Sequence, residues 1–138
     1  VLMHMRGTPE TMQQFTDYVD PVADVIRELS VKLRELRLAG VSDVIVDPGF
    51  GFSKTVEQNY RLLSGLTEIA RALGAPVLAG VSRKSMITKA LGVDVSEAMA
   101  GTIALGSFLL DRGTSFLRVH DVKEARATVD LFTLIDRN

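Results

Sequence analysis

The sequence predicts an α/β fold in which four parallel strands alternate with helices. Four short apolar runs end abruptly in polar or charged residues, and each is followed by a segment with the apolar spacing of an amphipathic helix. The runs recur at intervals of about 40 residues, enough for one strand and one crossover helix. Units of this kind build either a doubly wound sheet or a barrel.

The predicted strands are residues 1–5, 44–46, 77–81 and 116–120. The second run, Val-Ile-Val, has no polar alternation, which is typical of a parallel strand covered on both faces, and Asp47 is the first residue past its end. Parallel α/β folds bind ligands at the carboxyl ends of their strands. An Asp-Pro-Gly sequence alone is typical of a turn, but four polar strand ends together indicate a site.

Local signals mark the first two connecting helices. Asp20 is the expected N-cap and Pro21 the first helical residue of a helix that ends at Gly40. Residues 55–58 have the pattern of a capping box, and the apolar stripe that follows predicts one second helix ending at Gly74.

The third connection is longer than the others. We expect a short helix around residues 86–91, then a helix from about residue 96 to residue 111 whose small apolar middle, 98–110, is buried. A last helix follows Asp121, and the residues expected to face inward are Val122, Ala125, Val129, Phe132 and Ile135.

Composition excludes several classes of protein. The 138 residues carry a net charge of −1, without the basic excess of a nucleic-acid-binding surface. Cysteine is absent, which excludes disulfides and thiolate metal sites. No apolar stretch reaches the roughly 18 residues that span a bilayer, and no signal peptide opens the chain, so we expect a cytoplasmic protein that binds no membrane.

Four units are half of a barrel. A (β/α)8 barrel typically has about 250 residues, and an open four-stranded sheet leaves unpaired edges. The chain also begins with Val1 directly in a strand. We therefore expect residues 1–138 to form a single partial domain, the carboxyl-terminal half of a (β/α)8 barrel whose other half is absent.

The first candidate group surrounds Asp47. Its carboxylate can accept two hydrogen bonds from a heterocycle that carries an amidine-like edge. Gly49 and Gly51 let a flat ligand approach the backbone. Of Phe50 and Phe52, we expect one in the core and the other against an aromatic substrate.

The second group follows the third strand, where Ser82, Arg83, Lys84 and Ser85 meet a helix start that favours anions. For Arg83, a place in a solvated basic turn is as good an interpretation as a functional role. For Lys84, the neighbouring residues favour a functional role.

The third group is Arg118 and His120, which share one face of the last strand and suggest an anion clamp. The alternative is that His120 bonds a carbonyl and Arg118 pairs with Asp121. We interpret His4 as structural, and no metal site is encoded.

Together these motifs resemble dihydropteroate synthase. The resemblance rests on Met-His-Met-Arg-Gly-Thr-Pro at 3–9, Asp-Pro-Gly-Phe-Gly-Phe at 47–52, Gly-Val-Ser-Arg-Lys-Ser-Met at 80–86 and Arg-Val-His-Asp-Val at 118–122. It implies a transferase with a (β/α)8 barrel that joins 6-hydroxymethyl-7,8-dihydropterin diphosphate to p-aminobenzoate in folate biosynthesis. It also implies a sulfonamide target.

The resemblance further implies a role for each candidate residue. Asp47 and Lys84 would be catalytic and would bind the pterin, with Met3 on its ring. Arg118 and His120 would bind the pyrophosphate. The residues expected around p-aminobenzoate are Gly51, Phe52, Arg83 and Ser85.

The family implies a homodimer and Mg²⁺, whose protein ligand lies in the half that this chain lacks, so the chain alone is expected to be inactive. Two alternatives stay open. One is a pterin-dependent corrinoid methyltransferase, which the anion clamp disfavours. The other is a noncatalytic half-barrel that associates with a second chain.

Overall fold

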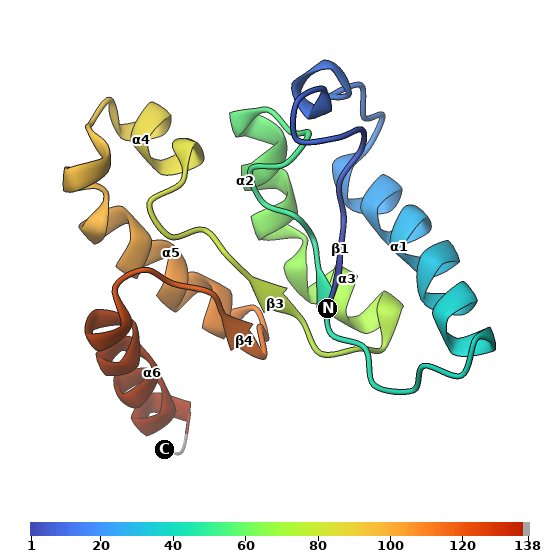
Figure 1. The fold of residues 1–138 in the computed structure, drawn as a ribbon. Coiled ribbons are helices and arrows are strands. Elements are labelled where there is room, and N and C mark those ends of the chain that lie inside the picture. The colour runs from blue at the N-terminus through green and yellow to red at the C-terminus, as the bar shows by residue number, and fades with distance from the viewer. Residues whose placement is uncertain (137–138) are drawn as a thin grey trace.

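The structure is a computed structural model that describes residues 1–136. Strands alternate with helices along the chain, and their parallel pairing confirms the predicted α/β class (Figure 1). The elements are β1 (Leu2–Met3), a 3-10 turn (Met12–Gln14), α1 (Pro21–Leu38), β2 (Val46–Asp47), α2 (Val56–Ser64), α3 (Leu66–Leu73), β3 (Leu78–Ala79), α4 (Ser85–Leu91), a second 3-10 turn (Val95–Glu97), α5 (Met99–Asp111), β4 (Phe116–Leu117) and α6 (Val122–Asp136).

The strands are shorter than the apolar runs that predicted them, at two residues each. β1 pairs with β2 in parallel, with Met3 opposite Asp47, and β3 pairs with β4 in parallel. A parallel bridge between Val46 and Val77 joins the two pairs. Asp47 is therefore the last residue of β2 rather than the first residue after it, and its position is fixed by the pairing.

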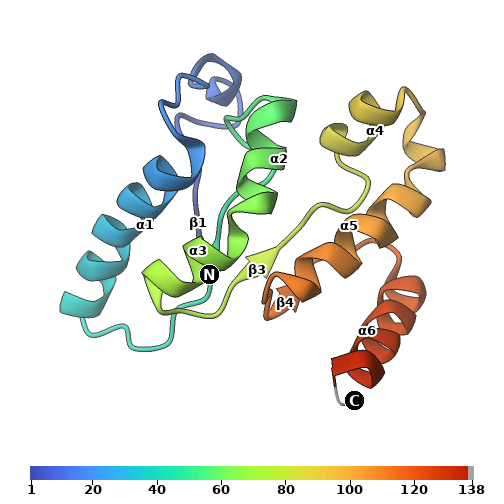
Figure 2. The ribbon, with the colours of Figure 1, turned by 180° about the vertical axis from the view of Figure 1, so that it is seen from behind.

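The helices cover one side of the strands and leave the other side open. Figure 1 looks onto the open side, and in Figure 2, from behind, α1, α3 and α5 lie in front of the strands. Val46 is fully buried, whereas its neighbours Val44 and Ile45 are partly exposed. The prediction that the whole run 44–46 is buried on both faces therefore holds only for Val46. Among residues 1–136, none of the helices has the length and apolar character required to cross a membrane.

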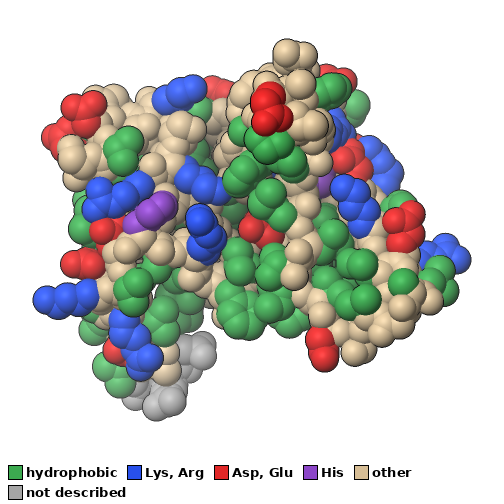
Figure 3. All heavy atoms as spheres, viewed as in Figure 1, with side chains coloured by type: hydrophobic (Ala, Val, Ile, Leu, Met, Phe, Trp, Pro, Cys, Tyr) green, Lys and Arg blue, Asp and Glu red, His purple; other side chains and the backbone are tan. Residues whose placement is uncertain are grey.

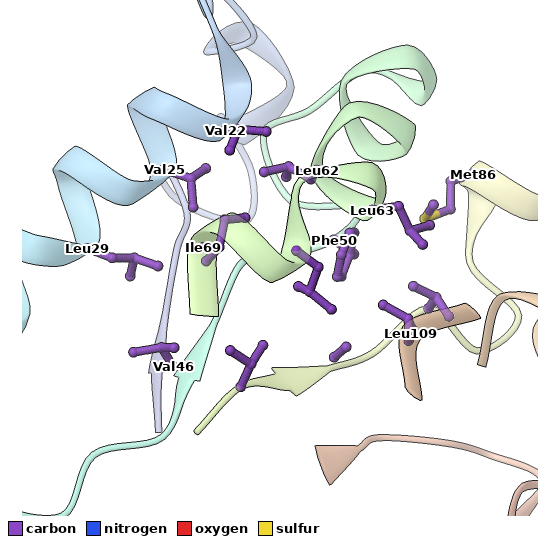
Figure 4. Packing of buried hydrophobic residues seen from close by; sticks show 14 of the residues in the cluster. Val22, Val25, Leu29, Val46, Phe50, Leu62, Leu63, Ile69, Met86 and Leu109 are labelled. Atoms are coloured by element: carbon purple, nitrogen blue, oxygen red, sulfur yellow. The ribbon is translucent and has the colours of Figure 1, made fainter. Parts of the chain in front are cut away.

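The core lies between the strands and the covering helices. Val25 and Leu29 point from α1 toward Ile69 of α3, and all three are fully buried (Figure 4). Each such side chain contributes roughly 1.5 to 3 kcal/mol by leaving water. The packing fixes the helices behind the sheet and leaves the strand ends free to form a site.

The first helix follows its sequence signals. The Asp20 side chain accepts hydrogen bonds from the backbone N–H groups of Val22 and Ala23, and Pro21 occupies the first turn. The predicted capping box is also present, because Thr55 and Gln58 each accept a hydrogen bond from the other's backbone N–H.

The prediction of a single second helix was wrong, because the segment breaks at Gly65 into α2 and α3. A Cβ atom at Gly65 would lie 2.5 Å from Cγ2 of Val22 in α1. The close approach of α1 requires glycine at this position. Periodicity along one segment carries no information about that contact.

The predicted burial of the last two helices was correct on one face only. Ile103 in the middle of α5 is 36% exposed, and α5 buries Thr102, Gly106 and Leu109 instead. Val122 and Ile135 of α6 are exposed, although both were expected to face inward. Ala125, Val129 and Phe132 are partly buried as expected. These helices lie at one end of the sheet, where no described element covers their outer faces.

Candidate functional site

Charged side chains meet at the carboxyl ends of the strands. Asp47 ends β2, Lys84 follows β3 and Arg118 follows β4. Burial raises the pKa of Asp47, while the positive charges of Lys84, Lys54 and Arg118 act to lower it. Lys and Arg side chains and a histidine gather above an apolar area on this face (Figure 3). The rim therefore holds one carboxylate within reach of three cations.

The loop after β2 holds the Asp47 carboxylate in place. The backbone N–H of Gly49 donates to Oδ1 of Asp47 at 2.7 Å, which leaves Oδ2 available to a ligand. Gly49 has φ of +72°, and a Cβ atom there would lie 1.9 Å from the carbonyl oxygen of His4. Only glycine fits this turn, so the same motif that predicted a site also builds its backbone.

Lys84 occupies the N-cap position of α4 and reaches back to the loop after β2. Its ammonium donates to the carbonyl of Phe50 and lies 4.7 Å from the centre of the Phe52 ring. Burial lowers the pKa of Lys84, and the charge of Asp47 opposes that shift. A Cβ atom at Gly51 would lie 3.2 Å from Cδ of this lysine. Lys84 thus packs on the glycine-rich loop beside Asp47.

One of the two phenylalanines lies in the core, as predicted. Phe50 is fully buried in the core, whereas Phe52 is only partly buried and presents its ring to Lys84. Asn59, a buried residue of α2, accepts from the backbone N–H of Gly51 at 2.7 Å. The loop is therefore anchored at both ends, with one aromatic ring facing the rim.

Arg118 and His120 are both exposed at the end of β4. The backbone N–H of Arg118 donates to the carbonyl of Ala79 at 2.9 Å, which extends the strand pairing up to the site. Nδ1 of His120 lies 2.9 Å from the buried Oγ of Ser82, and that oxygen also accepts from the His120 backbone N–H at 3.2 Å. Ser82 therefore orients the histidine.

Arg83 makes a different contact from those proposed for it. Its guanidinium forms two hydrogen bonds with the carboxylate of Asp121, at 2.9 and 2.7 Å, and its backbone N–H donates to Oγ1 of Thr102 at 3.0 Å. The bond from Arg83 lowers the pKa of Asp121. The proposed pairing of Arg118 with Asp121 is absent, because Arg83 takes both carboxylate oxygens.

Ser85 and Met3 complete the set of predicted site residues. Ser85 is exposed at the start of α4 and lines an open cleft of about 430 Å³ together with Gly51. Met3 is partly buried opposite Asp47 in the sheet. The structure therefore brings Asp47, Lys84, Gly51 and Phe52 into direct neighbourhood, while Arg83 is tied to Asp121.

Sequence reasoning missed Lys54 as a site residue. Lys54 is only 4% exposed, and its ammonium lies within 3.1 Å of Nδ1 of His4 and of the carbonyl of Gly49. His4 is structural as predicted, because it is buried and its Nε2 lies 2.9 Å from a Glu28 oxygen. A lysine directly before a capping box gives no signal of burial, since its acceptors come from the folded loop.

The described residues do not by themselves fit a magnesium ion. Within residues 1–136 no group of three or more His, Asp or Glu side chains is placed to hold a metal. Of the two carboxylates at the rim, Asp47 already accepts from Gly49 and faces cations, and Asp121 is paired with Arg83.

A comparison of the chain with protein families agrees with this geometry. The family described as pterin binding enzyme matches residues 1–120. The chain belongs to the pterin binding enzyme family. The match covers all four strand ends at the rim, including Asp47, Lys84 and His120.

Curated pterin binding enzymes similar to this chain are dihydropteroate synthases. The Escherichia coli K12 enzyme is 39% identical over 137 residues, which are 98% of this chain and 47% of that protein. The Synechocystis enzyme is 45% identical over 132 residues, 94% of this chain and 45% of that protein. The chain thus spans about half the length of the curated relatives it matches.

Solved structures of pterin binding enzymes share the fold. Dihydropteroate synthase from Thermus thermophilus superposes with a TM-score of 0.90 at 42% identity, over 96% of this chain and 53% of that one. The Yersinia pestis enzyme in complex with a sulfonamide drug superposes with a TM-score of 0.94 at 34% identity, over 99% of this chain and 50% of that one. Two further Thermus structures contain 6HMPPP and 4-aminobenzoate.

Proposed function

We propose that this chain supplies half of the active site of a dihydropteroate synthase, a transferase of folate biosynthesis. The reaction condenses 6-hydroxymethyl-7,8-dihydropterin diphosphate with 4-aminobenzoate and releases pyrophosphate. The observation that carries the proposal is the half-buried Asp47 carboxylate beside Lys84, with Arg118 nearby, at one rim of the strands. Such a site suits a ligand with a hydrogen-bond-donating ring and a polyanionic tail.

The fold of the complete enzyme is a (β/α)8 barrel, of which this chain is the carboxyl-terminal half. The open strand face and the unpaired edges of β1 and β4 support this proposal, since exposed parallel strands are otherwise an association hazard. Further β/α units would cover that face and complete the rim. Catalysis by the chain alone is not expected.

Asp47 and Lys84 bind the pterin. Oδ2 of Asp47 is free to accept from the amino-pyrimidine edge, because Oδ1 is occupied by the Gly49 N–H. The Lys84 ammonium donates to a ring acceptor when it leaves the Phe50 carbonyl. Met3, the sheet neighbour of Asp47, offers its thioether to the flat ring.

Arg118 and His120 bind the diphosphate. Both side chains are exposed at the end of β4, and Ser82 holds the His120 ring. The charge of Arg118 acts on both Asp47 and Lys84, so the diphosphate and pterin positions share one electrostatic field. Cations placed there stabilise negative charge as it develops on the leaving pyrophosphate.

The 4-aminobenzoate lies on the side of Phe52 and Ser85. The Phe52 ring offers an aromatic surface next to Lys84, and Gly51 keeps the loop flat. Ser85 lines the adjoining cleft. Arg83, tied to Asp121, contributes by shaping the loop between Ser82 and Lys84.

The proposed chemistry is a dissociative displacement. The bond between the pterin methylene carbon and the diphosphate oxygen breaks, and its electron pair leaves with pyrophosphate. The arylamine lone pair then forms the new C–N bond, and the amine loses a proton. Positioning and electrostatic stabilisation by Lys84, Arg118 and Asp47 supply the rate enhancement without a covalent enzyme intermediate. A magnesium ion would be held by the missing half, and no step here depends on it.

A homodimer is the proposed assembly. Exposed apolar side chains on α6, namely Val122, Leu131 and Ile135, provide a surface suited to a second copy. The arrangement of subunits does not enter the chemistry above.

A chimera tests the proposed function. This chain replaces the matching half of the Escherichia coli dihydropteroate synthase, and pyrophosphate release is measured with both substrates. The expected result is release by the chimera and a loss of roughly 10- to 100-fold in kcat/KM for the pterin diphosphate with Asp47→Asn, since hydrogen bonds to charged groups contribute about 1.5 to 3 kcal/mol.

Asp43→Asn is the matched control, because Asp43 is exposed and precedes β2 in the chain. Its chimera should keep the activity of the unsubstituted one. A chimera that is folded by circular dichroism but releases no pyrophosphate would contradict the proposal and favour a noncatalytic association module.

A further inference from the structure

The buried ammonium of Lys54 lies inside the loop that carries Phe52. It donates to the carbonyl of Gly49 at 3.1 Å and to the carbonyl of Phe52 at 2.9 Å. Its third neighbour is Nδ1 of His4 at 3.1 Å. An ammonium has three donors and no acceptor, so His4 accepts at Nδ1 and donates from Nε2 to Glu28. All three hydrogens of Lys54 are thereby used.

The loop around this ammonium has an unusual backbone. Gly49, Gly51 and Ser53 all have positive φ, at +72°, +81° and +49°. For Ser53 this conformation costs about 1 to 2 kcal/mol, so surrounding contacts must maintain it. The Ser53 hydroxyl accepts from the Arg6 backbone N–H, and Lys54 holds the carbonyls on either side of the turn. The loop is thus wound around an internal cation.

Charged and titratable groups surround Lys54 from several elements. Burial lowers its pKa to about 7, the carboxylates of Asp47 and Glu28 raise it, and Arg6 and Lys84 lower it. Neutral His4 and the Tyr18 ring, whose centre lies 5.8 Å from the ammonium, complete the surroundings. The three acceptors favour the charged form, because a neutral amine has one donor fewer.

We propose that Lys54 is a positioning residue that fixes the Phe52 ring beside Lys84 and thereby determines the affinity for 4-aminobenzoate. The inference rests on the proposed function. Lys54 touches neither substrate in this assignment and acts through two backbone carbonyls. The charge of Lys54 also acts on Asp47, but the position of Asp47 depends on Lys54 less, because the pairing of β2 with β1 holds it. Phe52 lies outside any strand or helix, and its backbone is bonded to Lys54 and Gly49 of the same loop.

Hydrogen exchange tests the structural half of this inference without reference to activity. The amides of Gly51 and Phe52 are both bonded, to Asn59 Oδ1 and to the Gly49 carbonyl. In the chain with Lys54→Met, we expect both amides to exchange about tenfold faster, since each lost hydrogen bond contributes about 1 kcal/mol. The amide of Ile69 in α3 serves as the core reference.

Lys89→Met is the matched control, because Lys89 is an exposed lysine on the cleft that Lys54 and Gly51 also line. It should leave the loop amides unchanged. If the amides of Gly51 and Phe52 exchange at the same rate in the two variants, relative to the amide of Ile69, the inference is overturned. If Lys54→Met does not fold, nuclear magnetic resonance of the unsubstituted chain decides: couplings from the Lys54 ammonium to the carbonyl carbons of Gly49 and Phe52 are expected, and their absence would contradict it.

Kinetics of the chimera test the functional half. Lys54→Met should raise KM for 4-aminobenzoate about tenfold while KM for the pterin diphosphate changes less than about threefold, in line with the loss of about 1.4 kcal/mol at the loop alone. A general loss of structure would lower activity without this split. Equal changes in both KM values would overturn the positioning role. An unsubstituted chimera without activity would count against the proposed function alone, and the exchange result would still decide the role of Lys54 in the loop.

Discussion

The ammonium of Lys84 and the ring of Phe52 face each other at 4.7 Å, across two loops that lie 32 residues apart in the sequence. Lys84 comes from the loop after β3 and Phe52 from the loop after β2. The contact places a cation on an aromatic surface directly beside Asp47. It joins the proposed pterin position to the proposed arylamine position.

Replacement of Lys84 by methionine should nearly abolish the proposed reaction. Lys84→Met keeps the length of the side chain but removes its charge and its donors. We expect kcat/KM of the chimera to fall roughly 100-fold, because a buried charge-assisted hydrogen bond and its electrostatic effect are both lost. Pyrophosphate release measures the change, with Lys32→Met, at an exposed position of α1, as the control. Activity near that of the control would remove Lys84 from the site.

Replacement of Ser82 by alanine should weaken diphosphate binding. Ser82→Ala removes the buried hydroxyl that contacts both the ring and the backbone N–H of His120. The freed ring samples other rotamers, so KM for the pterin diphosphate should rise several-fold, in line with a hydrogen bond of about 1 kcal/mol. Steady-state kinetics check this, and an unchanged KM would show that Ser82 does not orient His120.

Two glycines with similar backbone angles should respond differently to alanine. Gly49→Ala should destabilise the chain by about 3 kcal/mol or more, because the new Cβ meets the His4 carbonyl at 1.9 Å in addition to the strain of positive φ. Gly40→Ala, which has nothing within 4 Å, should cost about 1 kcal/mol. Urea unfolding measures both, and equal losses would argue against the tight turn.

The buried His4 should make the chain less stable in acid. Burial, followed by the charge of Lys54, lowers the pKa of His4 from 6.5 to about 4. Between these values the unfolded chain binds a proton that the folded chain does not, so the free energy of unfolding falls as the pH falls from 6.5 to 4. The loss should total about 3 kcal/mol.

Urea unfolding at a series of pH values tests this dependence. His4→Gln should flatten the dependence between pH 6.5 and 4, whereas Gln13→Ala, which changes an exposed uncharged side chain, should not. The same slope in all three proteins would show that His4 is not the group responsible.

Local sequence signals predicted the helix boundaries well. Asp20, Pro21 and the Thr55 capping box act through neighbours within a few residues, so the sequence contains all that they require. The break at Gly65 was missed because the contact that requires glycine there is with Val22, more than 40 residues earlier in the chain. The strands proved shorter than their apolar runs, because pairing with a neighbour defines a strand and apolarity does not.

The candidate site shows the same division. The topology of parallel units predicted that Asp47, Lys84 and Arg118 would meet, because the ends of parallel strands share one edge. It did not predict that Arg83, and not Arg118, would bind Asp121, since that choice depends on how the loop after β3 folds.

The sequence by itself determined the α/β class, the helix caps and the chemical types at each strand end, because these depend on periodicity and on residues close together in the chain. Only the tertiary structure decided which side chains connect the loops at the strand ends, and which lysine is buried. Lys54 shows the reason. Its three acceptors come from the residue after β1 and from two turns of the loop, and they converge on one ammonium only when the chain has folded.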